Sequence, residues 1–228
     1  MIKQHIDERG VATVTMDRED VHNAFDAQLI SELTKTFQLL DDDEKVRIIC
    51  LKGSGKNFSA GADLNWMKEM ANYSWDENYQ DSLKLASLMS TIANCKKPTM
   101  AIVQGASFGG GVGLIAACDF AICSDNASFC LSEVRLGLIP SVISPYVVKA
   151  IGSRAASRYF ISAEIFSAED ALKSGLVSEI CHLDELEKLA EHLVGLITAN
   201  APLAIIEVKK LIKRVEVLPI NEEMIRDT

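Results

Sequence analysis

Short apolar segments alternate with helical segments through the first half of the chain, and this alternation limits the fold more than any other feature. The segments with the composition of strands are 2–6, 11–16, 46–51, 99–103 and 119–123. Apolar residues recur at helical spacing in 27–40, after a capping Asp26, and in 75–94, after a capping Ser74. Strands that alternate with helices are typical of an α/β fold.

The last third of the sequence is mostly helical. Helical patterns are found at 145–151, 154–161, 168–174, 185–198 and 203–215, with one more short strand expected at 176–181. No internal repeat or linker separates this part from the rest. The sequence therefore predicts an α/β fold with a helical C-terminal region.

Composition excludes several classes of protein. The charge count, 23 Lys and Arg against 32 Asp and Glu, gives a net charge of −9, opposite to that of most nucleic-acid binders. The longest uncharged stretch, 98–118, contains Gln104 and several glycines, which disfavours a membrane span, and no signal sequence is visible at the N-terminus. We expect a cytoplasmic protein that binds neither nucleic acid nor membrane.

The six cysteines form no Cys-x-x-Cys pair, and no second pair completes a metal site with Cys181 and His182. Several lie in apolar stretches, so we expect buried free thiols. The sequence therefore predicts no metal site.

Two glycine-containing loops each lead from a strand towards a helix, at 57–64 and 105–113. Glycine lets a backbone approach a ligand closely and leaves N–H groups available, and a helix that starts near Gly111 adds partial positive charge. Two such loops can hold one developing oxyanion between them. Tight turns and close packing are the alternative explanation of the same glycines.

Two nucleotide-binding patterns fit poorly. Residues 111–116 match G-x-G-x-x-A, with Glu133 near the distance expected for a ribose contact, but the helix ends too early, at 118–119. Residues 53–56 are similar to a phosphate loop, but Cys50 replaces its first glycine and Asn57 replaces its Ser or Thr.

Glu133 lies in a largely apolar stretch, 129–140. Desolvation raises the pKa of a carboxyl group and suits it to proton transfer. The alternative is a surface glutamate beside Arg135.

Several motifs, in order along nearly the whole chain, resemble the enoyl-CoA hydratase/isomerase (crotonase) family. They are His-Asn-Ala-Phe at 22–25, Phe-Ser-Ala-Gly-Ala-Asp-Leu at 58–64, three glycines at 109–111, Ala-Cys-Asp at 117–119, and 133–140. Residues 64–67, Leu-Asn-Trp-Met, look closest to methylglutaconyl-CoA hydratase-like members, which are associated with leucine and terpenoid breakdown.

The resemblance implies a spiral core of ββα units over 1–180. It implies a helical trimerisation region over 181–228, which would be incomplete because the family continues past Thr228. It also implies an acyl-CoA thioester substrate, no cofactor beyond the coenzyme A of that substrate, and a homotrimer or a dimer of trimers.

The resemblance also assigns site residues. It places oxyanion-hole amides at Ala62 and Gly110 and a catalytic glutamate at Glu133. The residues that it places along the CoA and acyl path are Ala24, Ala60, Asp63, Leu64 and Gly109.

The chain departs from the family at Gly113, where hydratases usually have a second glutamate. We expect hydration of a 2-enoyl-CoA, on a branched or carboxylated acyl group such as methylglutaconyl. Two alternatives stay open: double-bond isomerisation, in which one base shuttles a proton, and non-catalytic binding of acyl-CoA.

Overall fold

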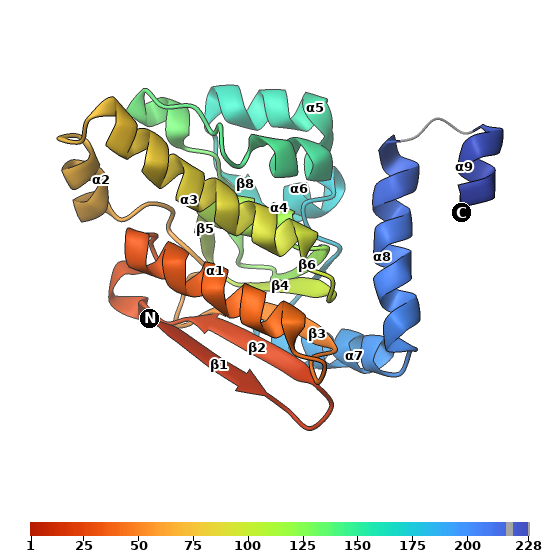
Figure 1. Cartoon of the computed structure of the whole chain (residues 1–228). Coiled ribbons are helices and arrows are strands. Elements are labelled where there is room, and N and C mark those ends of the chain that lie inside the picture. The colour runs from red at the N-terminus through yellow and green to blue at the C-terminus, as the bar shows by residue number, and fades with distance from the viewer. Residues whose placement is uncertain (218–220, 228) are drawn as a thin grey trace.

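The computed structural model describes residues 1–217 and 221–227, and its largest element is a six-stranded sheet (Figure 1). The strand order is β1-β2-β3-β4-β6-β9. Their bounds are β1 Ile2–Ile6, β2 Val11–Met16, β3 Ile48–Gly53, β4 Thr99–Val103, β6 Phe120–Ser124 and β9 Glu179–Cys181. Strand β1 is antiparallel to β2, and every later pair is parallel.

Alternate side chains of the sheet enter two different cores, as the period of a strand requires. Ala12 and Val14 of β2 join the larger core, beside helices α1 (Ala27–Asp42) and α3 (Trp75–Asn94). Val11 joins the smaller core on the opposite face, which α7 (Leu186–Thr198) covers. Burial on both faces explains why the parallel strands are almost continuously apolar.

A second, three-stranded sheet has the order β5-β7-β8, with bounds Ala106–Phe108, Ser128–Cys130 and Phe166–Ser167. Strands β5 and β7 are parallel, and β8 is antiparallel to β7. The sequence did not predict these strands. Helix α4, Gly110–Ala117, follows β5 directly and leads to β6.

The helix caps agree with the predicted starts. The Asp26 side chain accepts from the Leu29 N–H, at the start of α1. Ser74 and Glu77 form a full capping box at the start of α3. The two helical patterns at 145–151 and 154–161 lie in one element, α5 (Ser144–Ser162), which bends at Gly152 where φ is 73°.

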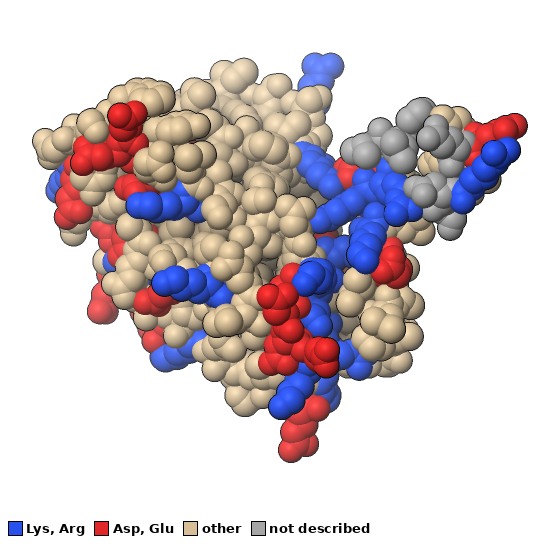
Figure 2. Space-filling view, in the orientation of Figure 1, with Lys and Arg blue, Asp and Glu red and all other residues tan. Residues whose placement is uncertain are grey.

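Helices α6 (Ala168–Ser174), α7, α8 (Pro202–Val217) and α9 (Glu222–Asp227) follow. Figure 1 shows α8 standing away from the body, and basic side chains gather where the two face each other (Figure 2). Lys209 binds Asp119 at 2.6 Å, and Lys149 binds Glu216 at 2.5 Å.

Within the described residues, no single helix is long and apolar enough to cross a membrane. The segments Leu183–Thr198 and Pro202–Glu216, which meet at 101°, have that length and composition only when taken together.

The predicted α/β fold and helical C-terminal region are confirmed. Three predicted strands were placed inaccurately: β3 begins two residues later than expected, β6 begins one residue later, and β9 occupies only the end of 176–181. The division of the chain at residue 180 stays a prediction. All six cysteines are free, and five of them are buried.

Candidate active site

Three chain segments lie side by side at one end of the small sheet. Ser59 forms a parallel bridge with Ser107, and Ser107 pairs with Phe129 where β5 runs beside β7. Ala62 comes three residues after Ser59, Gly110 three after Ser107, and Glu133 four after Phe129. Because the three segments run in parallel, their continuations meet at the same edge, where ligands of parallel sheets usually bind.

Phe25 connects the loops that carry Ala62 and Gly110. Its N–H donates to the Gly61 carbonyl at 2.7 Å, and its carbonyl accepts from the Asp63 N–H at 2.8 Å. Its ring lies against the second loop, with Cε2 only 3.0 Å from where a Cβ on Gly110 would be. The same residue therefore fixes both loops.

The buried Asn23 holds the first loop in place through hydrogen bonds. It has a left-handed backbone, with φ of 54°, and its side-chain amide donates to the carbonyls of Ser54 and Asn57, both at 2.9 Å. Its own carbonyl accepts from the Ser59 hydroxyl at 2.9 Å. The loop is thus fixed by hydrogen bonds to backbone groups rather than by packing alone.

The backbone N–H groups of Ala62 and Gly110 have no hydrogen-bond partner among the described residues. Ala62 is exposed and Gly110 is half-buried, so both can reach a bound ligand. Gly110 is also the first residue of α4, where backbone N–H groups and the helix dipole favour negative charge.

Gly109 makes the turn that brings Gly110 to this edge. Its φ and ψ are 49° and −116°, a backbone conformation that residues other than glycine rarely adopt. Its N–H donates to the Cys130 carbonyl at 2.8 Å, so this amide is not available to a ligand. A Cβ at Gly109 would lie 3.2 Å from Oε1 of Glu133.

Glu133 begins a 3-10 helix, Glu133–Leu136, just after β7. Its Oε2 is buried and has no partner among the described residues, and desolvation raises the pKa of its carboxyl group above the ordinary 4.5. Arg135 donates instead to the Ala163 carbonyl at 2.6 Å. The alternative of a surface glutamate beside Arg135 is therefore wrong, and Glu133 has the desolvation that proton transfer requires.

Arg18 connects the first loop, at Asp63, to the segment 24–26. Its guanidinium donates to the Ala24 carbonyl and binds Asp26 at 2.9 Å and Asp63 at 3.1 Å. The Asp63 carboxylate also caps α2 (Leu64–Met70) by accepting from the Asn65 N–H at 2.8 Å. This backbone hydrogen bond, with smaller contributions from the Trp66 N–H and Arg18, lowers the pKa of Asp63.

The residues expected along the substrate path lie around these loops. Ala24 and Asp63 are buried, and Leu64 is 71% exposed. The Ala60 N–H donates to the His22 carbonyl at 2.9 Å. Whether they touch a substrate stays a prediction. The structure places all eight predicted site residues on or beside three loops: Ala24, Ala60, Ala62, Asp63, Leu64, Gly109, Gly110 and Glu133.

The nucleotide patterns find no support in the structure. Helix α4 has only eight residues, and residues 54–57 turn into a loop rather than a helix. No group of three His, Cys, Asp or Glu side chains placed to hold a metal is found in the described part of the chain.

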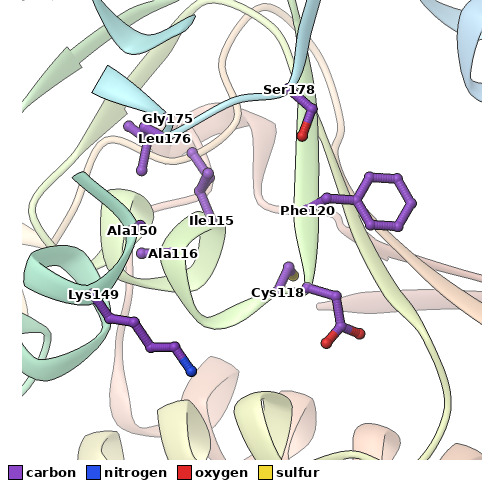
Figure 3. Close-up of a pocket in the computed structure, with 10 residues that line it drawn as sticks. Ile115, Ala116, Cys118, Phe120, Lys149, Ala150, Gly175, Leu176 and Ser178 are labelled. Atoms are coloured by element: carbon purple, nitrogen blue, oxygen red, sulfur yellow. The ribbon is translucent and has the colours of Figure 1, made fainter. Parts of the chain in front are cut away.

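A separate cavity of about 180 Å³ lies near the C-terminal end of α4. Figure 3 shows residues that line it, among them Ile115, Lys149 and Leu176. Its lining includes none of the predicted site residues, so it is distinct from the loops described above.

Sequence reasoning missed Arg18 and Ile143, a residue that contacts α4. The side chain of Ile143 lies against Gly113. Neither residue belongs to a motif with a chemical signature, and only the fold shows what they contact.

Comparisons with known proteins agree with one another. The family model described as Enoyl-CoA hydratase/isomerase matches residues 7–223. A Thermus thermophilus protein named as an enoyl-CoA hydratase is 32% identical over 90% of this chain and 81% of its own. A trans-2-decenoyl-[acyl-carrier-protein] isomerase of Streptococcus mutans serotype c is 30% identical over 82% of this chain and 72% of its own length. The crystal structure of an enoyl CoA hydratase/isomerase (crotonase) from Legionella pneumophila matches with a TM-score of 0.96 and 49% sequence identity. The match covers 99% of this chain and 86% of the other.

Proposed function

The chain belongs to the enoyl-CoA hydratase/isomerase family, and from this premise we propose that it adds water to the double bond of a 2-enoyl-CoA thioester. The observation that supports this most is the meeting of Ala62, Gly110 and Glu133 at one sheet edge, with two amides and one carboxylate oxygen unpartnered among the described residues. Donors and a desolvated base are what conjugate addition to a thioester needs.

The thioester oxygen accepts from the Ala62 and Gly110 amides. The Glu133 carboxylate takes a proton from water while the water oxygen bonds to C3, and the π electrons of the double bond move towards C2 and the thioester oxygen. The carboxylic acid then returns a proton to C2, and the thioester carbonyl is restored. The product is a 3-hydroxyacyl-CoA, and atoms and charge balance. Each amide contributes about 3 kcal/mol to the transition state.

Isomerisation of a double bond is the second candidate function. Gly113 stands where hydratases of the family usually have a second glutamate, so Glu133 is the one carboxylate expected at the reacting carbons. One base that removes a proton from C2 of a 3-enoyl-CoA and returns it to C4 needs no second acid. The relative from Streptococcus mutans is named as an isomerase of an acyl-carrier-protein substrate.

For the acyl group we propose a branched or carboxylated chain such as methylglutaconyl, because residues 64–67 resemble hydratases of that type. On the same resemblance we propose leucine breakdown as its pathway. Comparing kcat/KM for methylglutaconyl-CoA and crotonyl-CoA tests the proposal, which predicts the larger value for methylglutaconyl-CoA. Equal or reversed values contradict it.

We also propose a homotrimer or a dimer of trimers, as the resemblance implies, and a cytoplasmic location. Helix α8 supports assembly, because Leu203, Val208 and Ile212 are more than half exposed on it. Light scattering after size exclusion tests the trimer, and a monomer at micromolar concentration contradicts it.

The test of the function follows the loss of enoyl-thioester absorbance with crotonyl-CoA, and a separate assay uses a 3-enoyl-CoA. We expect hydration, and Glu133→Gln to lower it at least ~100-fold. The matched control is Glu169→Gln, because Glu169 is exposed on α6, and this variant should keep full activity. Turnover of the 3-enoyl-CoA alone supports the isomerase. Binding of acyl-CoA without turnover of either supports a binding subunit.

A further inference from the structure

Gly109, just before α4, and Gly113, within it, each leave a gap where another residue would have a Cβ. The Gly113 N–H donates to the Gly109 carbonyl at 3.2 Å, so the two glycines lie one helical turn apart, at about 6 Å. The Glu133 carboxylate lies in the gap at Gly109, with Oε1 3.2 Å from a built Cβ. The side chain of Ile143 fills the gap at Gly113.

The second gap is fully occupied. A Cβ at Gly113 would lie 2.3 Å from Cγ2 of Ile143, 2.9 Å from its Cβ, and 3.1 Å from Cε of Met89. Non-bonded carbon atoms normally stay about 3.5–4.0 Å apart. Even one added carbon at position 113 therefore cannot be accommodated unless Ile143 moves.

Ile143 is not free to move. It is 3% exposed and immediately precedes α5, where its carbonyl accepts from the N–H groups of Tyr146 and Val147 at 3.1 and 3.0 Å. Ser144, the next residue, donates its N–H to the Pro140 carbonyl at 2.9 Å. A shift of Ile143 would break the first turn of α5. Met89 can move aside more easily than Ile143, because only the end of its flexible side chain approaches Gly113.

We propose that Ile143 is a specificity-determining residue, which fills the place of a second carboxylate beside Glu133 and so limits the site to chemistry with one acid–base group. The proposal rests on the proposed function for the role of Glu133. Excluding a carboxylate from position 113 has two effects. It removes the like charge that would otherwise compete with Glu133, and it leaves Glu133 as the group that both accepts and returns the proton.

The steric part is tested without substrate by a double-mutant cycle. Gly113→Ala should lower Tm by about 3–10 °C, because it overpacks the core. In the Ile143→Ala background, which removes Cγ2 and keeps the Cβ at 2.9 Å, the same change should cost clearly less than in the wild type. The matched control is Ile143→Val, which keeps Cγ2, so Gly113→Ala should cost as much there as in the wild type. Equal costs in all three backgrounds overturn the proposal.

The chemical part uses Gly113→Glu combined with Ile143→Ala. We expect this variant to fold, and its pH profile of kcat/KM for crotonyl-CoA should gain a second ionisation from the added carboxylate. Gly113→Glu alone should show a Tm well below that of the combined variant. If Gly113→Glu alone equals the combined variant in Tm and pH profile, Ile143 does not exclude the acid and the proposal fails. Coupled Tm values with no hydration by any variant uphold exclusion by Ile143 and overturn the proposed hydration instead.

Discussion

Replacing Arg18 with methionine tests how the loop that carries Ala62 is held. The Arg18 guanidinium lies 2.9 Å from the Asp26 carboxylate and 3.1 Å from the Asp63 carboxylate, and the three side chains are 15%, 24% and 11% exposed. Breaking a fully buried ion pair costs about 3–5 kcal/mol, and an exposed pair contributes less than about 1 kcal/mol. For partners this far buried, we expect Arg18→Met to lower the free energy of unfolding by about 2–3 kcal/mol. In a chain of this size that is a fall in Tm of about 4–12 °C.

The same variant should lower kcat for hydration by about 10–100-fold, because Asp63 follows Ala62 directly and a small displacement of an oxyanion donor is costly. Its KM should change less, since Arg18 is held by Ala24, Asp26 and Asp63 rather than by a ligand. Thermal melting by circular dichroism gives Tm, and initial rates with crotonyl-CoA give kcat and KM. Arg18→Lys keeps the charge but cannot replace the guanidinium fork, so its loss should be intermediate. Unchanged Tm and kcat in Arg18→Met refute the positioning role.

Three further predictions concern Glu133, Gly109 and the thiols. Desolvation raises the pKa of Glu133, so kcat/KM should fall as the pH drops through a value above 4.5, and Glu133→Gln should remove this limb. Because the folded state holds that proton more tightly than the unfolded state, the stability from Glu133 is lost as pH rises through its folded pKa. Glu133→Gln should therefore raise Tm at pH 7, and a lower Tm contradicts the burial argument. Gly109→Ala should lower kcat about 10–100-fold, because it strains a turn beside Glu133 and moves an oxyanion donor; a wild-type rate excludes that strain. Burial raises the pKa of Cys50 and Cys95 to about 12, so a thiol reagent at pH 8 should modify only the half-buried Cys181 before unfolding. Titration of more than one thiol in the native protein contradicts this.

The parts of the fold that local signals specify were predicted well. Ser74 and the helical spacing after it predict α3 with its observed bounds. The break between 151 and 154 corresponds to the left-handed Gly152 within α5. In these cases a capping residue or a spacing of apolar residues identifies the element without any tertiary contact.

The missed elements depend on tertiary contacts. Strands β5, β7 and β8 have two or three residues each, too few for a pattern, and exist because they pair with one another. Helix α2 buries none of its residues, so it has no apolar spacing to detect. Helix α9 was not predicted either, because its segment is mostly polar.

The site was predictable in its motifs and not in its environment. The glycine loops indicated two sets of amides, but a pattern of residues cannot say which N–H groups stay unpartnered. The burial of Glu133 was open between two alternatives until the fold placed Arg135 against Ala163. Ile143 is thirty residues from Gly113 in sequence, and only the packing of α5 on α4 brings them together.

The polarisation of the thioester carbonyl is the most direct test of the two-amide site. A saturated acyl-CoA labelled with ¹³C at its carbonyl carbon binds without reacting, so its stretching frequency can be followed by isotope-edited infrared spectroscopy. Donation from Ala62 and Gly110 predicts a lower frequency in the complex than in water, a smaller decrease in Gly109→Ala, and the full decrease in Glu133→Gln. A carbonyl that binds at its frequency in water would mean that these amides do not hold the thioester oxygen.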